Sequence, residues 1–357
     1  MIPFFNKNIF SEIKLVNIFV LIYFLFEIIS RIFAIIPEGA FIGLKRLLLF
    51  LIFYVSLIKI TDEKNLYRIL LVIIIIFSLI STYEVIRYII TYKDVIKESN
   101  SEEIRLSYFA HPLTVAEMKL FLLLSILPVL FTRTKIIIKS YYIIILSVPI
   151  VISMLLTQSR NVILALFVCL VVYGFFNRKF LIAFILFIIL AAIFVPGSYK
   201  DRVTSIFDPK HPSNESRLMM WETGFKMFKD HPLTGVGDNE ITKVYEMYKP
   251  IERHGEGAHL HSNFMMILAT TGIFGFISYI CFFLFIFIKQ INIYRIVQTP
   301  VEKYLVLGSI LTNIGFQIAG FFEWTFGKHH DMTIFFFLIA IPFIIYKFYL
   351  NKKIISG

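Results

Sequence analysis

The chain has 357 residues, of which 58% are hydrophobic, and its formal net charge is +11 at pH 7. This apolar share is well above that of soluble domains and excludes a water-soluble globular fold. Apolar runs of about 20 residues recur from one end of the chain to the other, which is the length that a helix needs to cross a bilayer. The alternating pattern of barrel strands is not seen in the sequence. We therefore predict an all-α polytopic membrane protein.

The apolar runs predict about ten transmembrane helices, and the first run is too long for the core of a signal peptide. We expect one integrated membrane domain, with an N-terminal bundle at 1–195, an extramembrane loop with surface helices at 196–263 and C-terminal helices at 264–357. The predicted spans are residues 15–36, 41–60, 67–91, 112–132, 136–156, 160–177, 180–196, 264–288, 302–322 and 332–349.

Lysine and arginine are concentrated at the two termini and in alternate connections of this scheme. The positive-inside rule then places both termini in the cytoplasm and the long loop on the opposite side of the membrane. The net positive charge thus reflects membrane orientation and gives no support to nucleic-acid binding. Cys169 and Cys281 both lie inside apolar segments, so we expect no disulfide framework.

The long loop mixes acidic and basic residues, and its length in a chain of short connections indicates a function. Its middle reads SNESRLMMWETGFKMFKDHPLTGVG, where Ser213 and Asn214 are helix-capping types. Gly235 and Gly237 do not form a dinucleotide-binding loop, because no strand precedes them. We predict a helix lying on the outer membrane surface, with one apolar face formed by Leu218, Trp221, Phe225 and Phe228.

Two arginines and two histidines on the far side of the membrane are the candidate functional residues. Arg160 begins a span and Arg217 lies in the first turn of the surface helix, where a guanidinium and free backbone amides suit a diphosphate. Arg160 could instead snorkel to the interface, and Arg217 could be a solvated residue of an amphipathic helix. His259 and His261 stand one residue apart just before an apolar run.

The histidines also have two alternative interpretations. They could lie at the headgroup level as amphipathic residues, or they could bind a metal together with His254. The metal interpretation is the weaker one, since a His-x-His pair needs an extended backbone to converge and the sequence places no clear third ligand.

Charged residues and glycines inside the spans are given structural interpretations. Glu27 with Arg31, and Glu84 with Arg87, have the spacing of pairs on one helix face. Glycines in TGIFG (271–275) indicate close helix packing.

Three segments, in this order, resemble the bacterial O-antigen ligase and polymerase superfamily of membrane glycosyltransferases. LLTQSRNVILAL (155–166) is similar to its Ser/Thr-x-Arg at the outer end of a span, and SRLMMWETGFKMFKDHPLTGVGDNE (216–240) to its Arg-plus-aromatic helix with a following Pro and Gly-x-Gly turn. AHLHSNFMMILATTGIFGF (258–276) is similar to its His-Ser-Asn element and the Gly-x-x-Gly helix that follows. Family members often have about a dozen spans, so the resemblance allows up to twelve here.

The resemblance implies transfer of a glycan from undecaprenyl diphosphate to an acceptor hydroxyl, on the periplasmic face of the bacterial inner membrane. It implies that His261 is the general base and that Arg160 and Arg217 contact the diphosphate. An activated sugar–diphosphate bond needs a base and a stabilised leaving group, so we expect an inverting reaction without cofactor or metal.

The favoured acceptor is lipid A-core oligosaccharide, as in the O-antigen ligases. A polymerase that uses another lipid-linked repeat unit is the first alternative, and a transporter of a lipid-linked sugar is the second. A transporter is disfavoured because neither internal repeats nor broken helices are evident in the sequence.

Several further residues are weaker candidates for the same site. His111 is one of them, and Glu323 is interpreted as an interfacial anchor at the outer end of a late span. The secondary candidates are His259, Asn263, Arg105 and Glu222.

Overall fold

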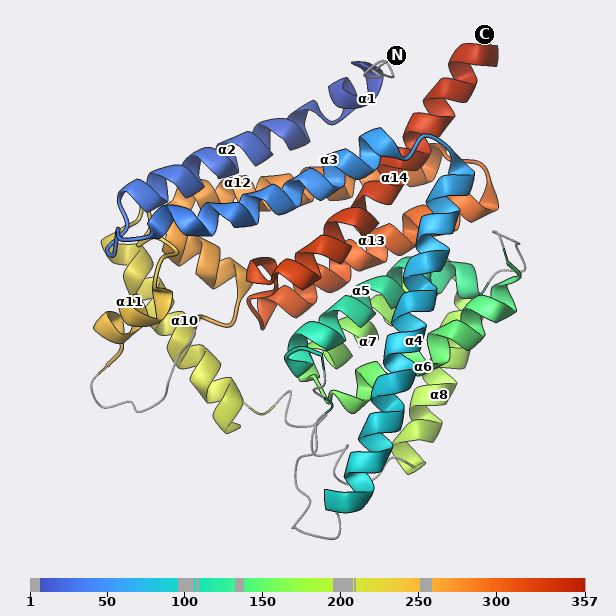
Figure 1. The fold of residues 1–357 in the computed structure, drawn as a ribbon, viewed down its shortest axis with the longest axis horizontal. Coiled ribbons are helices and arrows are strands. Elements are labelled where there is room, and N and C mark those ends of the chain that lie inside the picture. The colour runs from blue at the N-terminus through green and yellow to red at the C-terminus, as the bar shows by residue number, and fades with distance from the viewer. Residues whose placement is uncertain are drawn as a thin grey trace. The chain divides into compact units, whose positions relative to one another are not determined.

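The computed structural model describes residues 7–95, 106, 109–131, 138–194, 208, 210–250 and 259–356, and these are almost entirely helical (Figure 1). Within those ranges no strand is found. The elements are α1 (Lys7–Glu12), α2 (Lys14–Ile32), η1 (Ala40–Leu49), α3 (Phe50–Lys59), α4 (Glu63–Val95), α5 (Pro112–Leu130), α6 (Ser140–Leu156), α7 (Arg160–Phe176), α8 (Arg178–Phe194), α10 (Pro212–Asp230), α11 (Ile241–Tyr248), α12 (Asn263–Ile296), α13 (Pro300–Phe321), η2 (Thr325–Gly327) and α14 (His329–Ser356).

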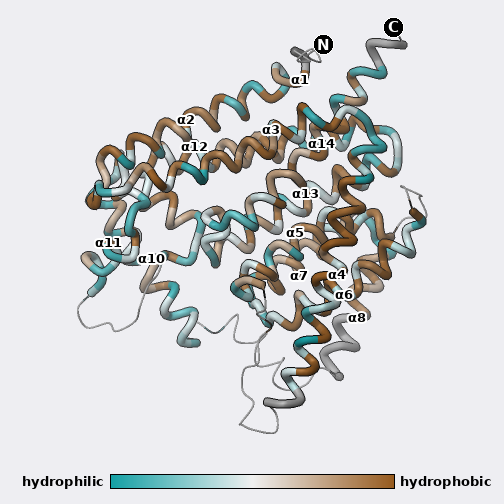
Figure 2. The backbone as a smooth tube through the Cα atoms, in the orientation of Figure 1, coloured by the Kyte–Doolittle hydropathy of each residue, from teal (hydrophilic) through white to brown (hydrophobic). Residues whose placement is uncertain are grey.

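Each of the ten predicted spans coincides with a helical segment. In the described part of the chain, seven helices are long and apolar enough to cross a membrane, and α6 and α7 are apolar but shorter, with 17 residues each. In Figure 2, α2 and α12 are coloured as hydrophobic over much of their length, whereas α10 and α11 carry hydrophilic stretches. The chain is therefore a multi-pass helical membrane protein.

The chain divides into two compact units, which are described separately. The first unit consists of Met1–Leu51, Leu186–Lys289 and Gln317–Met332, and the second of Ile52–Ile185, Gln290–Phe316 and Thr333–Gly357. The unit boundaries therefore differ from the sequence segments at 1–195, 196–263 and 264–357, since each unit draws on three separate stretches of chain.

In the first unit, α2 packs along α12 through aromatic pairs. Phe19 stacks on Phe285 with ring centroids 5.3 Å apart, and Phe26 stacks on Phe274 at the same separation. The two helices lie side by side in Figure 1 as well. Flat aromatic contacts of this kind suit helices that have lipid, not water, around them.

A buried charge cluster joins α2, η1 and the loop before α11. Arg31 lies 3.3 Å from Glu27, which confirms the pair predicted from the sequence. Arg46 lies 2.8 Å from Glu27 and also pairs with Asp238, whose carboxylate is 3.5 Å from Arg31. Two acids and two bases thus neutralise one another where single charges would be costly.

The long helix α12 is broken at Gly272, where φ is 70° and ψ is −171°. The loop that follows α10 repairs the break by pairing the exposed backbone groups. The amide of Val236 donates to the carbonyl of Ala269 (2.9 Å), and the amide of Ile273 donates to the carbonyl of Pro232 (2.8 Å). The sequence showed neither internal repeats nor a broken helix, and both were reasons against a transporter. The break at Gly272 removes the second reason.

Gly235 and Gly237 allow this contact between loop and helix. A Cβ at Gly235 would lie 2.2 Å from the carbonyl carbon of Thr270, and the residue has a φ of 69°. The amide of Gly237 donates to the carbonyl of Thr270 at 3.1 Å. The Gly-x-Gly sequence is therefore a docking turn against α12, in agreement with the structural interpretation.

In the second unit, α4, α5, α6 and α7 pack around buried polar groups. Glu84 on α4 pairs with Lys119 on α5 and accepts a hydrogen bond of 2.6 Å from Ser153 on α6. The predicted pairing of Glu84 with Arg87 is therefore wrong. Glu84 is fully buried and Arg87 is exposed, so the partners of this carboxylate come from the neighbouring helices.

Helix α10 differs from its prediction in its cap. His211, not Ser213 or Asn214, caps the helix, because its Nδ1 accepts the amide of Ser213 at 3.3 Å. The buried positions are Thr223, Gly224 and Met227, whereas Leu218 and Phe225 of the predicted apolar face are exposed. Trp221 of the predicted apolar face packs on Phe321, and contact of Leu218 and Phe225 with the membrane surface stays a prediction.

Candidate active site

Four polar side chains of the first unit gather where α12 begins and α13 ends. His259 and His261 precede α12, Glu323 follows α13, and Lys328 lies between η2 and α14. The carboxylate of Glu323 is at the centre of the cluster and only 1% exposed, whereas the side chains of His259 and His261 are 24% and 29% exposed. The cluster thus joins a buried acid to two imidazoles that solvent and ligands can reach.

Glu323 contacts all three of the other side chains. Its Oε2 lies 3.0 Å from Nδ1 of His261. Its Oε1 lies 3.5 Å from Nε2 of His259 and 3.4 Å from Nζ of Lys328. The prediction of Glu323 as an interfacial anchor is therefore wrong, because an anchor would present its carboxylate to water or lipid headgroups.

The local backbone explains why the two histidines face the same carboxylate. Leu260 between them is fully buried and lies against Gly224 of α10, where an added Cβ would be 2.6 Å from the leucine side chain. His261 adopts a φ of 43°, and its amide donates to Nδ1 of His259 at 3.2 Å. The leucine anchors the segment on α10, and both imidazoles are left on the side of Glu323.

Asn263 fixes the start of α12 to the segment that carries Glu323. Its Oδ1 accepts the amide of Phe326 at 2.9 Å, and its side chain is fully buried. It also lies against Gly320 of α13, where a Cβ would be 2.0 Å from Nδ2 of the asparagine. Asn263 therefore connects the two chain segments of the cluster, which is a structural role for this secondary candidate.

The hydrogen bonds distinguish the two imidazoles. Burial alone would raise the pKa of the Glu323 carboxyl, but the hydrogen bond from His261 and the charge of Lys328 hold that pKa well below its usual value. Facing an ionised acid, Nδ1 of His261 carries its proton and donates, so Nε2 keeps its lone pair. In His259 the lone pair of Nδ1 already accepts the amide of His261. His261 is thus the imidazole whose second ring nitrogen, Nε2, can accept a proton.

Arg217 lies in the same unit, on α10, where its Nη1 donates to Ser213 at 3.2 Å. Burial lowers the pKa of the Arg217 guanidinium, and the charge of Glu323 acts in the opposite direction. One helical turn further on, Trp221 packs edge-on against Phe321 with ring centroids 5.3 Å apart. Among the described residues, Nε of Arg217 and Nε1 of Trp221 have no hydrogen-bond partner. This side of α10 thus carries two buried donors without a hydrogen-bond partner among the described residues.

Two other sequence candidates, Arg160 and His111, belong to the second unit, and Glu222 lies on α10. Arg160 is the first residue of α7. The next residue, Asn161, donates from its side-chain Nδ2 to the carboxylate of Glu117 at 2.8 Å. Glu222 is 54% exposed and pairs with Lys226 on α10, and His111 caps α5 by accepting the amide of Leu113. Arg105 and His254 fall outside the described residues.

The cluster also contains a set of possible metal ligands. His259, His261 and Glu323 each offer one ligand atom, and these atoms lie within 4.8 Å of one another. The sequence analysis found no clear third ligand, and Glu323 supplies it from 62 residues away. Two imidazoles and a carboxylate are a ligand set that zinc accepts. However, the ammonium of Lys328 lies 3.4 Å from the same carboxylate, and a fixed cation there disfavours a second one.

Lys328 was missed by the sequence analysis, and Glu323 was assigned to the wrong role. The stretch FFEWTFGKHHD holds both in a short connection between two apolar helices. The available signal is an acid flanked by aromatic residues, which is an unusual setting for a solvated carboxylate.

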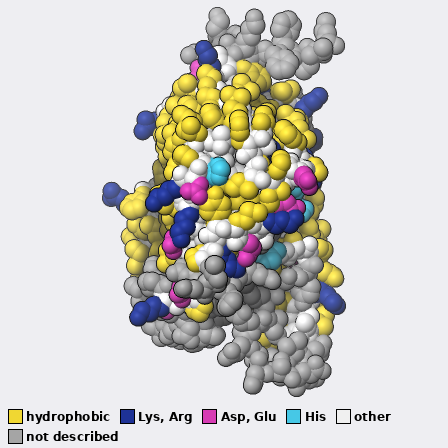
Figure 3. All heavy atoms as spheres, turned by 90° about the vertical axis from the view of Figure 1, so that its left-hand side faces the viewer, with side chains coloured by type: hydrophobic (Ala, Val, Ile, Leu, Met, Phe, Trp, Pro, Cys, Tyr) yellow, Lys and Arg dark blue, Asp and Glu magenta, His cyan; other side chains and the backbone are white. Residues whose placement is uncertain are grey.

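Charged and histidine side chains gather below a hydrophobic band in Figure 3, on the face of the first unit that carries α10 and α11.

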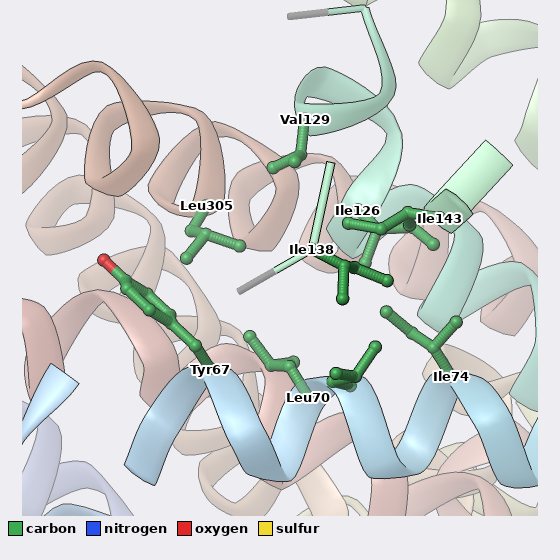
Figure 4. Close-up of a pocket in the computed structure, with 9 residues that line it drawn as sticks. Tyr67, Leu70, Ile74, Ile126, Val129, Ile138, Ile143 and Leu305 are labelled. Carbon is green, nitrogen blue, oxygen red and sulfur yellow. The ribbon is translucent and has the colours of Figure 1, made fainter. Parts of the chain in front are cut away.

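A cavity in the second unit offers no comparable chemistry (Figure 4). Apart from the hydroxyl of Tyr67, its lining side chains are hydrocarbon. It is a packing space for apolar groups and not a second acid–base site. The lining residues are Tyr67, Leu70, Leu71, Ile74, Ile126, Val129, Ile138, Ile143 and Leu305.

The apolar helices and the histidine–glutamate cluster together define a multi-pass membrane protein with a cluster of titratable side chains beside its membrane helices. The family model described as O-Antigen ligase matches residues 143–280. This match supports the O-antigen ligase and polymerase superfamily and confirms the resemblance predicted from the sequence, and members of the family are glycosyltransferase-like enzymes. A search of curated proteins returned no match. The matched residues include Arg160, Arg217 and His261, whereas Glu323 and Lys328 lie beyond them.

Proposed function

We propose that this protein is an O-antigen ligase, which transfers a glycan from undecaprenyl diphosphate to a hydroxyl of lipid A-core oligosaccharide. The observation that carries the proposal is the contact of 3.0 Å between His261 Nδ1 and the buried Glu323 carboxylate. This contact gives one imidazole a fixed orientation and a basic Nε2, which is what the acceptor hydroxyl requires. The family match supports the substrate class.

His261 acts as the general base in this proposal. The acceptor oxygen attacks C1 of the donor sugar while its proton passes to Nε2 of His261, and the bond from C1 to the diphosphate oxygen breaks. Direct displacement inverts the configuration at C1. Glu323 stabilises the imidazolium that forms, since the carboxylate and the new positive charge are hydrogen-bonded. The reaction needs neither nucleotide nor metal, because the diphosphate is already a good leaving group.

Arg217 and Arg160 bind the diphosphate of the donor. Arg217 stays charged at every relevant pH, and its guanidinium is a planar fork of N–H donors that suits the oxygens of a diphosphate. Arg160 supplies a second guanidinium at the N-terminal end of α7, where the free amides and the helix dipole favour an anion. Together they offset the negative charge that the departing diphosphate retains.

The orientation follows from the distribution of basic residues. We propose that the protein lies in the bacterial inner membrane, with both termini in the cytoplasm and with the cluster of His261 and Glu323 facing the periplasm. In this orientation α10 and α11 belong to a periplasmic loop, where a lipid-linked donor and a lipid A-core acceptor are both accessible.

Reconstituted transfer tests the proposal. The purified chain in detergent would receive undecaprenyl-diphosphate glycan and lipid A-core, with EDTA and without nucleotide. We expect glycosylated lipid A-core with inverted anomeric configuration, and a rate at least about 100-fold lower for Arg217→Ala and Arg160→Ala. Arg295→Ala, which removes an exposed arginine at the end of α12, is the matched control and should leave the rate unchanged.

The same assay separates the alternatives. Elongation of the lipid-linked glycan in the absence of lipid A-core would identify a polymerase. Movement of the donor across proteoliposome membranes without any new glycosidic bond would identify a transporter. Either result would overturn the ligase proposal.

A further inference from the structure

The proposed reaction gives no part to Lys328, although this side chain belongs to the cluster. Its ammonium lies 3.4 Å from Oε1 of Glu323, and its side chain is 19% exposed. It comes from the short connection between η2 and α14, so it approaches the carboxylate from a different segment than the histidines do. The position of Lys328 is therefore a feature of the fold and does not follow from the His-x-His sequence.

The three remaining side chains form an incomplete metal site around the same carboxylate. His259, His261 and Glu323 bring one ligand atom each to within 4.8 Å of one another. Two imidazoles and a carboxylate with an open fourth position are the donor set of many zinc sites. A bilayer protein exposed to free metal ions thus risks losing its proposed base to a metal.

We propose that Lys328 is the internal counter-ion of this cluster: its ammonium takes the place of a divalent cation beside Glu323 and keeps zinc from His259 and His261. This inference rests on the proposed function, because it explains how a His-His-Glu cluster stays available as a metal-independent base. Lys328 is a positioning residue, since it acts on Glu323 and not on the substrate.

The charges support this assignment. A zinc ion bound by these three groups would lie within a few ångströms of the ammonium of Lys328, and like charges at that range repel strongly in a partly buried site. The ammonium has three donors and satisfies Oε1 of Glu323, while His261 satisfies Oε2. Both oxygens of Glu323 therefore have a partner without a metal ion: the ammonium of Lys328 at Oε1 and the imidazole of His261 at Oε2.

Other charged groups near the carboxylate do not replace Lys328. Arg217 interacts electrostatically with Glu323, but its guanidinium is on α10 and hydrogen-bonds to Ser213. His329 and His330 follow Lys328 directly and are exposed. These two histidines are a possible second zinc-binding pair, which the experiment has to distinguish from the cluster.

Zinc titration of the purified full-length chain tests the inference without any glycan substrate. Zinc chloride would be added in competition with a fluorescent chelator to wild type, Lys328→Ala, Lys328→Leu and Lys328→Arg. We expect the Ala and Leu variants to bind one zinc ion at least about tenfold more tightly than wild type, because a positive charge beside the ligand carboxylate is gone. Lys328→Arg should behave as wild type, since it keeps the charge.

Double variants locate the gained zinc ion. Adding Glu323→Gln or His259→Ala to Lys328→Ala should abolish the gain, whereas zinc at His329 and His330 would not respond to either change. The inference is overturned if Lys328→Ala and Lys328→Leu bind zinc no better than wild type. It is also overturned if wild type itself binds zinc and loses it with Glu323→Gln, since the cluster would then be a metal site. The transfer assay fails or succeeds independently of these outcomes.

Discussion

Nδ1 of His261 lies 3.0 Å from Oε2 of Glu323, although 62 residues separate the two along the chain. The carboxylate selects the tautomer of the imidazole and stabilises its protonated form. We therefore expect Glu323→Gln to lower kcat for glycan transfer by about 100-fold or more, with a smaller change in KM. Steady-state kinetics with Glu246→Gln as the control checks this, because Glu246 is an exposed partner of Lys249 on α11. An unchanged kcat in Glu323→Gln would remove Glu323 from the site.

Glu323 also makes stability depend on pH. Its folded-state pKa is lower than the usual 4.5, so its ionised form stabilises the fold above about pH 4.5, and this contribution is lost as the pH falls through the folded-state value. We expect wild type to melt at a higher temperature than Glu323→Gln at pH 7, with a difference that shrinks below pH 4.5. Thermal unfolding in detergent from pH 3 to pH 8 measures the difference. A difference that grows toward acid pH would contradict the assignment.

The docking of the Gly-x-Gly turn against the break in α12 gives a third prediction. Gly235→Ala places a Cβ 2.2 Å from the backbone of Thr270 at a φ of 69°, so we expect a loss of at least about 2 kcal/mol in unfolding free energy. Gly39→Ala is the matched control, since it has a φ of 74° but its nearest contact is 3.6 Å away. Its cost should stay near 1 kcal/mol, which is the strain alone. Equal losses in the two variants would argue against the close contact.

The buried charge cluster of α2 and η1 predicts a larger effect. Asp238→Asn removes one of the two acids that neutralise Arg31 and Arg46, so we expect a loss of about 3–5 kcal/mol. Chemical denaturation in detergent measures it. Glu246→Gln breaks an ion pair whose acid is 48% exposed and should cost less than 1 kcal/mol. If the two variants cost the same, the buried cluster does not hold the loop to the bundle.

Helix type and approximate position were predictable from the sequence because the apolar runs are long and their composition has one physical solution in a bilayer. The pair of Glu27 and Arg31 was predictable from spacing on one helix. The partner of Glu84 was not, since Lys119 lies on another helix and contacts between helices leave no periodic signal. The same limit applies to α10, where nothing in the sequence indicated that Leu260 would lie against Gly224.

In the site, the resemblance pointed to His261 and Arg217 as candidates, but the side chains around them could not be predicted. Glu323 and Lys328 reach the cluster from a connection between α13 and α14, and only the fold brings that connection to the start of α12. The resemblance already favoured His261 over His259, and the hydrogen bond between Nδ1 of His259 and the amide of His261 adds a structural reason for that choice.

The most direct test of the account is the rate of glycan transfer by His261→Ala, measured beside His330→Ala, which removes an exposed histidine of the same unit. Both variants would be compared with wild type at equal folded concentration, with undecaprenyl-diphosphate glycan and lipid A-core as substrates. We predict loss of transfer by at least about 1,000-fold in His261→Ala and a wild-type rate in His330→Ala. Transfer at the wild-type rate by folded His261→Ala would contradict the central claim.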